Sequence, residues 1–110
     1  MTVKTLSQRE TEILEKAVEV LKRNLHPDKI ILFGSRGKGK FQKYSDFDLA
    51  VSNGTPDIRT ERRISEEIEE IAGLYKIDIV YLNSVDEEFK DIILKTGEVK
   101  YERRGKVLVK

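Results

Sequence analysis

The stretch that decides the fold is IILFGSRGKGKFQKYSDFDLAV, residues 30–51. Two short runs, 29–33 and 46–52, lie at its two ends and each extends one residue beyond it. Both are rich in β-branched and aromatic residues and are bounded by glycine or turn residues, which is typical of β-strands. Side chains alternate between the two faces of a strand, so Asp46 and Asp48 project from the same face. The stretch therefore predicts two strands, the second of which carries a pair of carboxylates.

Helices and further strands are predicted outward from this stretch. A Ser-x-x-Glu capping box and apolar residues at helical spacing predict a helix over 7–24, and similar patterns predict helices before residues 73 and 97. The first helix is predicted to begin with a capping box formed by Ser7 and Glu10. The second is predicted to begin at Thr55 and Pro56 and to end at Gly73, and the third to begin with a capping box of Ser84 and Glu87 and to end at Gly97. A third strand is expected over 76–82, an edge strand around 99–101, and a further apolar run at 107–109. This order favours an α/β (α+β) fold with a short mixed β-sheet and helices packed mainly on one face.

The composition limits the size of the protein and excludes several kinds of site. A length of 110 residues predicts a single domain over 1–110. The chain has no cysteine and only one histidine, His26, which excludes thiolate and histidine-rich metal sites. Lys and Arg total 21 against 20 for Asp and Glu, and this balance argues against direct nucleic-acid binding. No apolar run is long enough to span a membrane, and the N-terminus lacks a signal region, so we expect a cytoplasmic protein.

Three aspartates are the candidate chemistry-bearing residues. Asp46 and Asp48 would repel each other unless a cation lay between them, and Mg²⁺ is the hard ion that carboxylate oxygens prefer. Asp78 is the only charged residue in the run Ile77–Leu82, and it would complete a cluster of three if its strand lay beside 46–52. The alternative is that Asp46 ends a loop, Asp48 meets a surface lysine, and Asp78 faces solvent from an edge strand.

The segment that follows the first strand is a candidate phosphate site. Gly34 allows close approach of the backbone, and the Ser35 hydroxyl and Arg36 guanidinium could bind phosphate oxygens. The residues from Gly34 onward also read as the start of a P-loop, but Phe41 stands where that motif needs Ser or Thr, so we reject a P-loop. A short G-x-x-G match to RNA-binding KH domains is left as an outside alternative, and it does not explain the aspartates.

The pattern Gly34-Ser35, ten residues, then Asp46-x-Asp48 resembles the G-S-x10-D-x-D signature of the polymerase-β-like nucleotidyltransferase superfamily. The surrounding residues resemble its minimal (MNT) branch, including Asp78 in KIDIVYL and the segment ILKTGEVKYE, so that the resemblance covers most of 10–102. Gly37 departs from this pattern, because a helix-favouring residue is often found there.

The resemblance implies a fold, a set of cofactors and a role for each site residue. The expected fold is the nucleotidyltransferase fold, and the expected cofactors are two Mg²⁺ ions with ATP or another nucleoside triphosphate as substrate. Asp46, Asp48 and Asp78 would be catalytic and metal-binding residues. Gly34, Ser35 and Arg36 would bind the triphosphate.

The resemblance also implies a partner. It suggests transfer of a nucleotide, AMP above all, to a hydroxyl of an all-helical HEPN-type protein, with this chain as the antitoxin of a toxin–antitoxin pair. Two alternatives remain open at this point: a non-catalytic nucleotide-binding antitoxin that acts sterically, and a transferase for small molecules of the aminoglycoside type. A homo-oligomer also remains open, since the small-molecule alternative needs an acceptor cleft formed by dimerisation.

Overall fold

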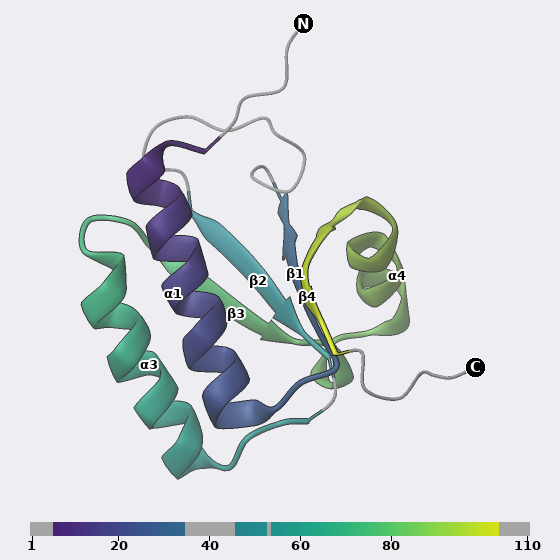
Figure 1. The fold of residues 1–110 in the computed structure, drawn as a ribbon. Helices are drawn as coiled ribbons and strands as arrows, with labels where there is room; N and C mark the ends of the chain where they lie inside the picture. Colours follow the sequence, from purple (N-terminus) through teal and green to yellow (C-terminus); the bar gives the residue numbers. More distant parts are fainter. Residues whose placement is uncertain (1–5, 35–45, 53, 104–110) are drawn as a thin grey trace, which may run out of the picture.

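The computed structural model describes residues 6–34, 46–52 and 54–103, which form a mixed β-sheet with helices on both faces (Figure 1). In chain order the elements are α1 (Gln8–Leu25), β1 (Lys29–Phe33), β2 (Phe47–Val51), α3 (Ile58–Ala72), β3 (Ile77–Tyr81), the 3-10 turn η1 (Leu82–Ser84), α4 (Glu87–Thr96) and β4 (Glu98–Glu102). Each strand and helix predicted within these residues is present, with ends within about two residues of the prediction. The predicted strand at 107–109 lies outside the described residues.

The sheet has the strand order β3-β2-β1-β4, and it combines antiparallel and parallel pairing. β1 pairs antiparallel with both β2 and β4, whereas β2 and β3 are parallel and are connected through α3. A parallel pair requires such a crossover because the chain must return to the starting end of the sheet. The crossover places β3 next to the strand that carries Asp48, although 25 residues separate Val51 at the end of β2 from Ile77 at the start of β3.

The larger core lies between the sheet and the helices α1 and α3, which cover the same face (Figure 1). Alternate strand residues point into it, including Phe47 and Leu49 of β2, both of which are fully buried. From α1, Ile13, Ala17 and Leu21 follow the helical repeat and form one side of this core. The apolar side chains of the DFDLAV run therefore point into the core, as the alternation of residues predicted.

The opposite face of the sheet carries a smaller core under α4. Ile93 of α4 is fully buried against Ile31 and Ala50 of the sheet, together with Leu82. Gly97 ends α4, and its backbone approaches β1 so closely that an added Cβ would overlap the Ile31 side chain. The prediction of helices mainly on one face is confirmed for α1 and α3, while α4 covers one part of the other face.

The sequence prediction of two helix starts was wrong by a few residues. Thr55 and Pro56 do not cap α3; Asp57 does, because its carboxylate accepts a hydrogen bond from the Thr60 amide at 2.8 Å. Likewise α4 is capped by Asp86, which accepts from the Phe89 amide at 2.8 Å, and Ser84 belongs to η1. In both cases the residue immediately before the helix is an aspartate, which serves as well as serine or threonine.

The remaining helix ends follow the sequence more closely. The capping box of α1 is present, with both the Ser7 and the Glu10 side chains bonded to backbone amides. Gly73 follows α3 with a positive φ of 62°, as expected of a glycine at a helix end. Within the described ranges, no helix has the length and the apolar character needed to cross a bilayer.

Candidate active site

Asp48 and Asp78 stand opposite each other on adjacent strands. They are register partners in the parallel pair β2–β3, so both side chains leave the same face of the sheet. Their neighbours Phe47 and Ile77 point to the opposite face and into the core under α1 and α3. The condition set by the sequence, that Asp78 should lie beside the 46–52 strand, is therefore met.

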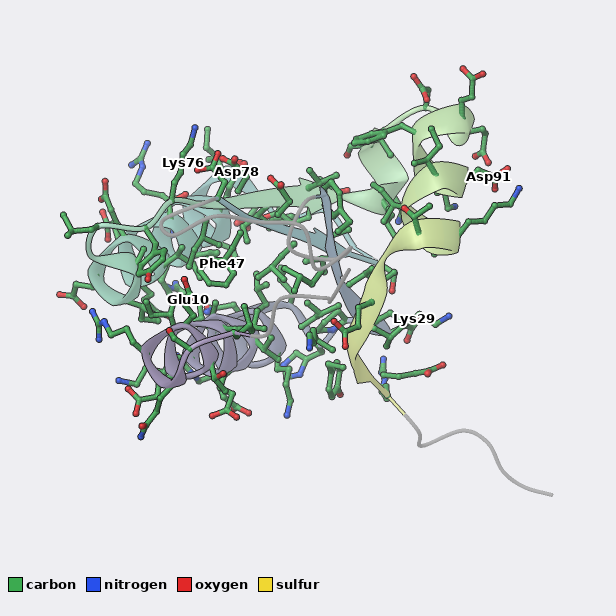
Figure 2. The ribbon with its side chains drawn as sticks, turned by 90° about the horizontal axis from the view of Figure 1, so that it is seen from above. Glu10, Lys29, Phe47, Lys76, Asp78 and Asp91 are labelled. Carbon is green, nitrogen blue, oxygen red and sulfur yellow. The ribbon has the colours of Figure 1, made fainter. Side chains whose placement is uncertain are left out.

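This carboxylate pair lies on the face of the sheet that α1 and α3 leave uncovered. Figure 2 shows Asp78 and Lys76 on the side of the sheet away from α1, whereas Phe47 and Glu10 lie on the α1 side. Asp46 is exposed and directly precedes β2. Both Asp48 and Asp78 are partly buried, so each keeps part of its surface accessible to a ligand.

Gly34 lies against the Asp48 carboxylate. Its φ is +72°, in the left-handed region, and a Cβ added there would stand 2.6 Å from Asp48 Oδ2. The backbone conformation therefore favours glycine, and any larger residue would have to displace the Asp48 carboxylate. Since Phe33 is the register partner of Asp48, the turn after β1 begins directly beside the carboxylate pair.

The electrostatic environment of Asp48 disfavours its charged form. Partial burial raises the pKa of the Asp48 carboxyl, and repulsion from the Asp78 and Asp46 carboxylates raises this pKa further. Lys76 opposes these effects, and its Nζ lies 3.8 Å from Asp78 Oδ1. Two further carboxylates thus act on Asp48, and among the described residues exposed Lys76 is the cation that opposes them.

The donor set suits a hard divalent cation. Carboxylate oxygens are the ligands that Mg²⁺ prefers, and a cation between Asp48 and Asp78 would remove the repulsion that raises the Asp48 pKa. In the described part of the chain, however, no three acidic or histidine side chains already converge as a complete metal-binding group. Asp46 is therefore near enough to repel Asp48 but does not complete a three-carboxylate group with the pair. Phosphate oxygens of a nucleotide would supply further ligands.

The structure also identifies residues that the sequence reasoning missed. Lys76 was not singled out, although its position two residues before Asp78 on the same strand could have indicated a shared face. Tyr75 packs its ring 5.7 Å from that of Phe47 and donates a hydrogen bond to buried Glu10 at 3.1 Å. The Phe47 amide bonds the Lys76 carbonyl at 2.8 Å, so these contacts fix the start of β3 against the start of β2.

Two of the candidate phosphate-binding residues cannot be placed. Ser35 and Arg36 lie outside the described residues, as does the rest of the segment up to residue 45. Their roles remain predictions, together with the metal-binding roles of the three aspartates. The structure does bring together Gly34, Asp48 and Asp78, in that order across strands β1, β2 and β3.

Comparison with known proteins identifies the family to which this arrangement belongs. Residues 15–106 match the family described as polymerase beta, nucleotidyltransferase. The chain belongs to this nucleotidyltransferase family, which confirms the resemblance stated from the G-S-x10-D-x-D pattern. It is also 35% identical over 92 residues to the probable protein adenylyltransferase MntA of Haemophilus influenzae, a match covering 82% of this chain and 81% of that relative.

Solved structures share the same fold. One is a toxin–antitoxin crystal structure with AMP-PNP, which matches with a TM-score of 0.68 and 24% identity over 82% of this chain and 73% of the other. Another contains a tri-AMPylated Shewanella oneidensis HEPN toxin in complex with an MNT antitoxin, with a TM-score of 0.63 and 22% identity over 84% of this chain and 72% of the other. The predicted nucleotidyltransferase fold is thereby confirmed.

Proposed function

We propose that this chain transfers AMP from ATP to a hydroxyl group of a HEPN-type partner protein and so acts as the antitoxin of a toxin–antitoxin pair. The observation that carries the proposal is the register pairing of Asp48 with Asp78 beside Gly34, on the open face of the sheet. The likeness to MntA, named as a probable protein adenylyltransferase, supports the kind of nucleotide and acceptor. The structural likeness to the AMPylated HEPN toxin complex is consistent with it.

The three aspartates would hold Mg²⁺ in this proposal, as two ions. When bound, the metal would neutralise the charge of the triphosphate and lower the pKa of the acceptor hydroxyl. Asp48 occupies the central position, because it lies between Gly34 on one side and Asp78 on the other. The repulsion that raises the Asp48 pKa is what makes this face attractive to a cation.

The residues divide the site into a nucleotide side and an acceptor side. Gly34, with Ser35 and Arg36, would bind the β- and γ-phosphates on the β1 side. Asp78, on the β3 side, would accept the proton of the acceptor hydroxyl. The hydroxyl oxygen then forms a bond to the α-phosphorus, the bond from that phosphorus to the bridging oxygen breaks, and pyrophosphate leaves with the electron pair. Catalysis would consist mainly of positioning and charge neutralisation.

The test is co-expression of the chain with its helical partner, followed by intact-mass measurement of the partner with ATP and Mg²⁺. We expect the wild-type chain to add adenylyl groups to the partner. Asp48→Asn should abolish the labelling, since the substitution removes a charge and a ligand oxygen at the centre of the site. Absence of labelling with the wild-type protein would contradict the proposal.

A matched control separates loss of the site from a general effect of removing a carboxylate. Asp91→Asn makes the same chemical change on the exposed surface of α4, far from the carboxylate pair (Figure 2). This variant should label the partner at the wild-type rate. If Asp48→Asn still neutralises the toxin fully, the chain acts sterically, and labelling of a small aminoglycoside in place of the partner would indicate the small-molecule alternative.

A further inference from the structure

The outer edge of β3 is open to another strand. β3 is the last strand of the sheet, and no strand pairs with its far side within the described ranges 6–34, 46–52 and 54–103. In a parallel pair, alternate residues of a strand bond the neighbouring strand. Because the Phe47 amide bonds the Lys76 carbonyl, Lys76 and Asp78 face β2, and the backbone groups of Ile77, Ile79 and Tyr81 point outward.

A groove runs along this edge between β3 and α3. Its volume is about 510 Å³, and residues of β3 line it together with Ile64 and Ile68 of α3. Asp78 and Lys76 belong to the same lining, so the groove reaches the outer member of the carboxylate pair. The three edge residues pack on the larger core yet are only partly buried, so part of each residue remains exposed at this edge.

The order of the residues across the sheet determines from which side an acceptor can approach. Gly34 lies on the β1 side of Asp48, and this is the side on which the triphosphate is expected. The carboxylate that would accept the proton, Asp78, is carried by the outermost strand. The outer edge of β3 is therefore a side from which an acceptor hydroxyl reaches Asp78 without displacing the nucleotide.

We propose that an extended segment of the partner protein adds to β3 as a fifth strand and presents its acceptor hydroxyl to Asp78. This inference rests on the proposed function and specifies how its substrate binds. Main-chain hydrogen bonds to Ile77, Ile79 and Tyr81 would provide affinity, as in other cases of strand addition. Every second side chain of the added strand would share the face of Asp78, and the acceptor would be one of these.

The charge of the groove indicates the chemistry of this segment. Glu61 and Glu69 of α3 line the groove with Asp78, against one lysine, Lys76. Glu61 is close enough to contribute, after burial, to the raised pKa of Tyr81 at the end of the edge strand. The complementary segment is therefore basic, with cationic side chains on its α3 side and the hydroxyl on the opposite side.

The direct test is amide hydrogen exchange of the chain, alone and in complex with its co-purified partner. The outward amides of Ile77, Ile79 and Tyr81 should exchange readily in the free chain and at least about tenfold more slowly in the complex. The amide of Glu102 is the internal control. Lys29, its register partner, bonds Ser52 of β2, so Glu102 faces outward on the opposite edge. Unchanged exchange along β3, or protection at Glu102 alone, would overturn the proposal.

A pair of proline variants provides the second test, with partner labelling as the readout. Ile79→Pro removes one outward amide together with a side chain packed on the larger core, and Ile79→Ala removes the side chain but keeps the amide. Labelling at limiting partner should be at least about tenfold lower for the proline variant than for the alanine variant. Glu102→Pro makes the same change at the other edge of the sheet and should label normally. Labelling by Ile79→Pro at the rate of Ile79→Ala would overturn the proposal.

The two proposals fail in different ways. If the wild-type chain labels no partner, the proposed function is wrong, whatever the exchange rates show. If the wild-type chain labels its partner while Ile79→Pro labels as well as Ile79→Ala, only the strand addition is wrong. Thermal unfolding of each variant shows whether it folds, and for a variant that does not fold the exchange of the wild-type complex decides.

Discussion

At the scale of single residues, the fold destabilises the ionised form of the Asp48 carboxyl. This carboxyl is partly buried and stands near two other carboxylates, and both influences raise its pKa. A native pKa above the unfolded value means that the folded state disfavours the ionised group. The site is therefore arranged for a ligand at the expense of the stability of the free protein, which is a common feature of functional sites.

Asp48→Asn is expected to stabilise the free protein while it removes activity. At neutral pH the variant lacks the ionised carboxylate, so its free energy of unfolding should exceed that of the wild type by up to about 1 kcal/mol, because solvent screens part of the repulsion. The native pKa is raised, so the penalty in the wild type grows as the pH rises through that pKa and disappears below about pH 4.

Thermal unfolding of the wild type and of Asp48→Asn at pH 7 and at pH 3.5 or so checks this sign. The gain in melting temperature should be present at the higher pH and absent at the lower one. A variant that is less stable than the wild type at neutral pH would show that Asp48 makes a favourable contact in the free protein. Asp91→Asn again serves as the control.

Gly34→Ala tests the close approach of the turn after β1 to the carboxylate pair. The added Cβ would stand 2.6 Å from Asp48 Oδ2, and the residue would keep a positive φ. We expect a loss of about 1–3 kcal/mol in the free energy of unfolding, together with loss of partner labelling. Gly54→Ala is the matched control, since Gly54 also has a positive φ but nothing lies within 4 Å of its added Cβ.

If Gly54→Ala loses as much stability as Gly34→Ala, the backbone conformation alone explains the cost. If labelling by Gly34→Ala is unchanged, the contact with Asp48 does not matter for the site. Denaturant unfolding gives the first quantity, and the intact-mass assay gives the second.

At the scale of secondary-structure elements, the sequence predicted where helices and strands lie better than it predicted how helices begin. Periodicity depends on many residues, so β1 was predicted with its observed ends, Lys29–Phe33. A cap depends on one side chain, and near α3 and α4 several residues could fill that role. Asp57 and Asp86 prevailed because each directly precedes the first helical turn with an extended backbone and an oxygen acceptor.

Asp86→Ala is expected to destabilise the protein by about 1 kcal/mol, through loss of the bond to the Phe89 amide at the start of α4. Ser84→Ala, at the position that the sequence favoured as the cap, should change stability by no more than a few tenths of a kcal/mol. Urea unfolding of both variants measures the difference. A larger effect at Ser84 would show that the capping box predicted from the sequence forms in solution.

At the scale of the whole molecule, the site depends on contacts between distant parts of the chain. The pair Asp46 and Asp48 could be found from local sequence alone, because residues two apart in an extended run share a face, although in the structure only Asp48 lies within β2 and Asp46 directly precedes it. Asp78 could be placed beside them only if β2 and β3 were neighbours, and this pairing forms through the α3 crossover. The resemblance to the family indicated that Asp78 belongs to the site. The contacts of Lys76 and Tyr75 depend on the folded arrangement and could not be predicted from local sequence.

Tyr75→Phe tests the link between α1 and the start of β3. The variant retains the ring packed on Phe47 but loses the donor to Glu10, which is buried at the start of α1. We expect the free energy of unfolding to fall by about 1–2 kcal/mol, since bonds to charged groups exceed ordinary ones. Denaturant unfolding checks the value, and Tyr81→Phe provides a tyrosine control on the same strand region. Equal stability of Tyr75→Phe and wild type would show that Glu10 does not need this donor.

The crossover that joins β2 to β3 determines how late in synthesis and folding the site can be assembled. In the proposed reaction, a chain synthesised only as far as β2 carries Gly34 and Asp48 but lacks Asp78, the residue proposed to accept the proton. Long-range parallel pairing is slow to form compared with local helices. Nascent or partly unfolded copies would consequently be inert toward their target, so that neutralisation begins only when synthesis and folding of the whole domain are complete.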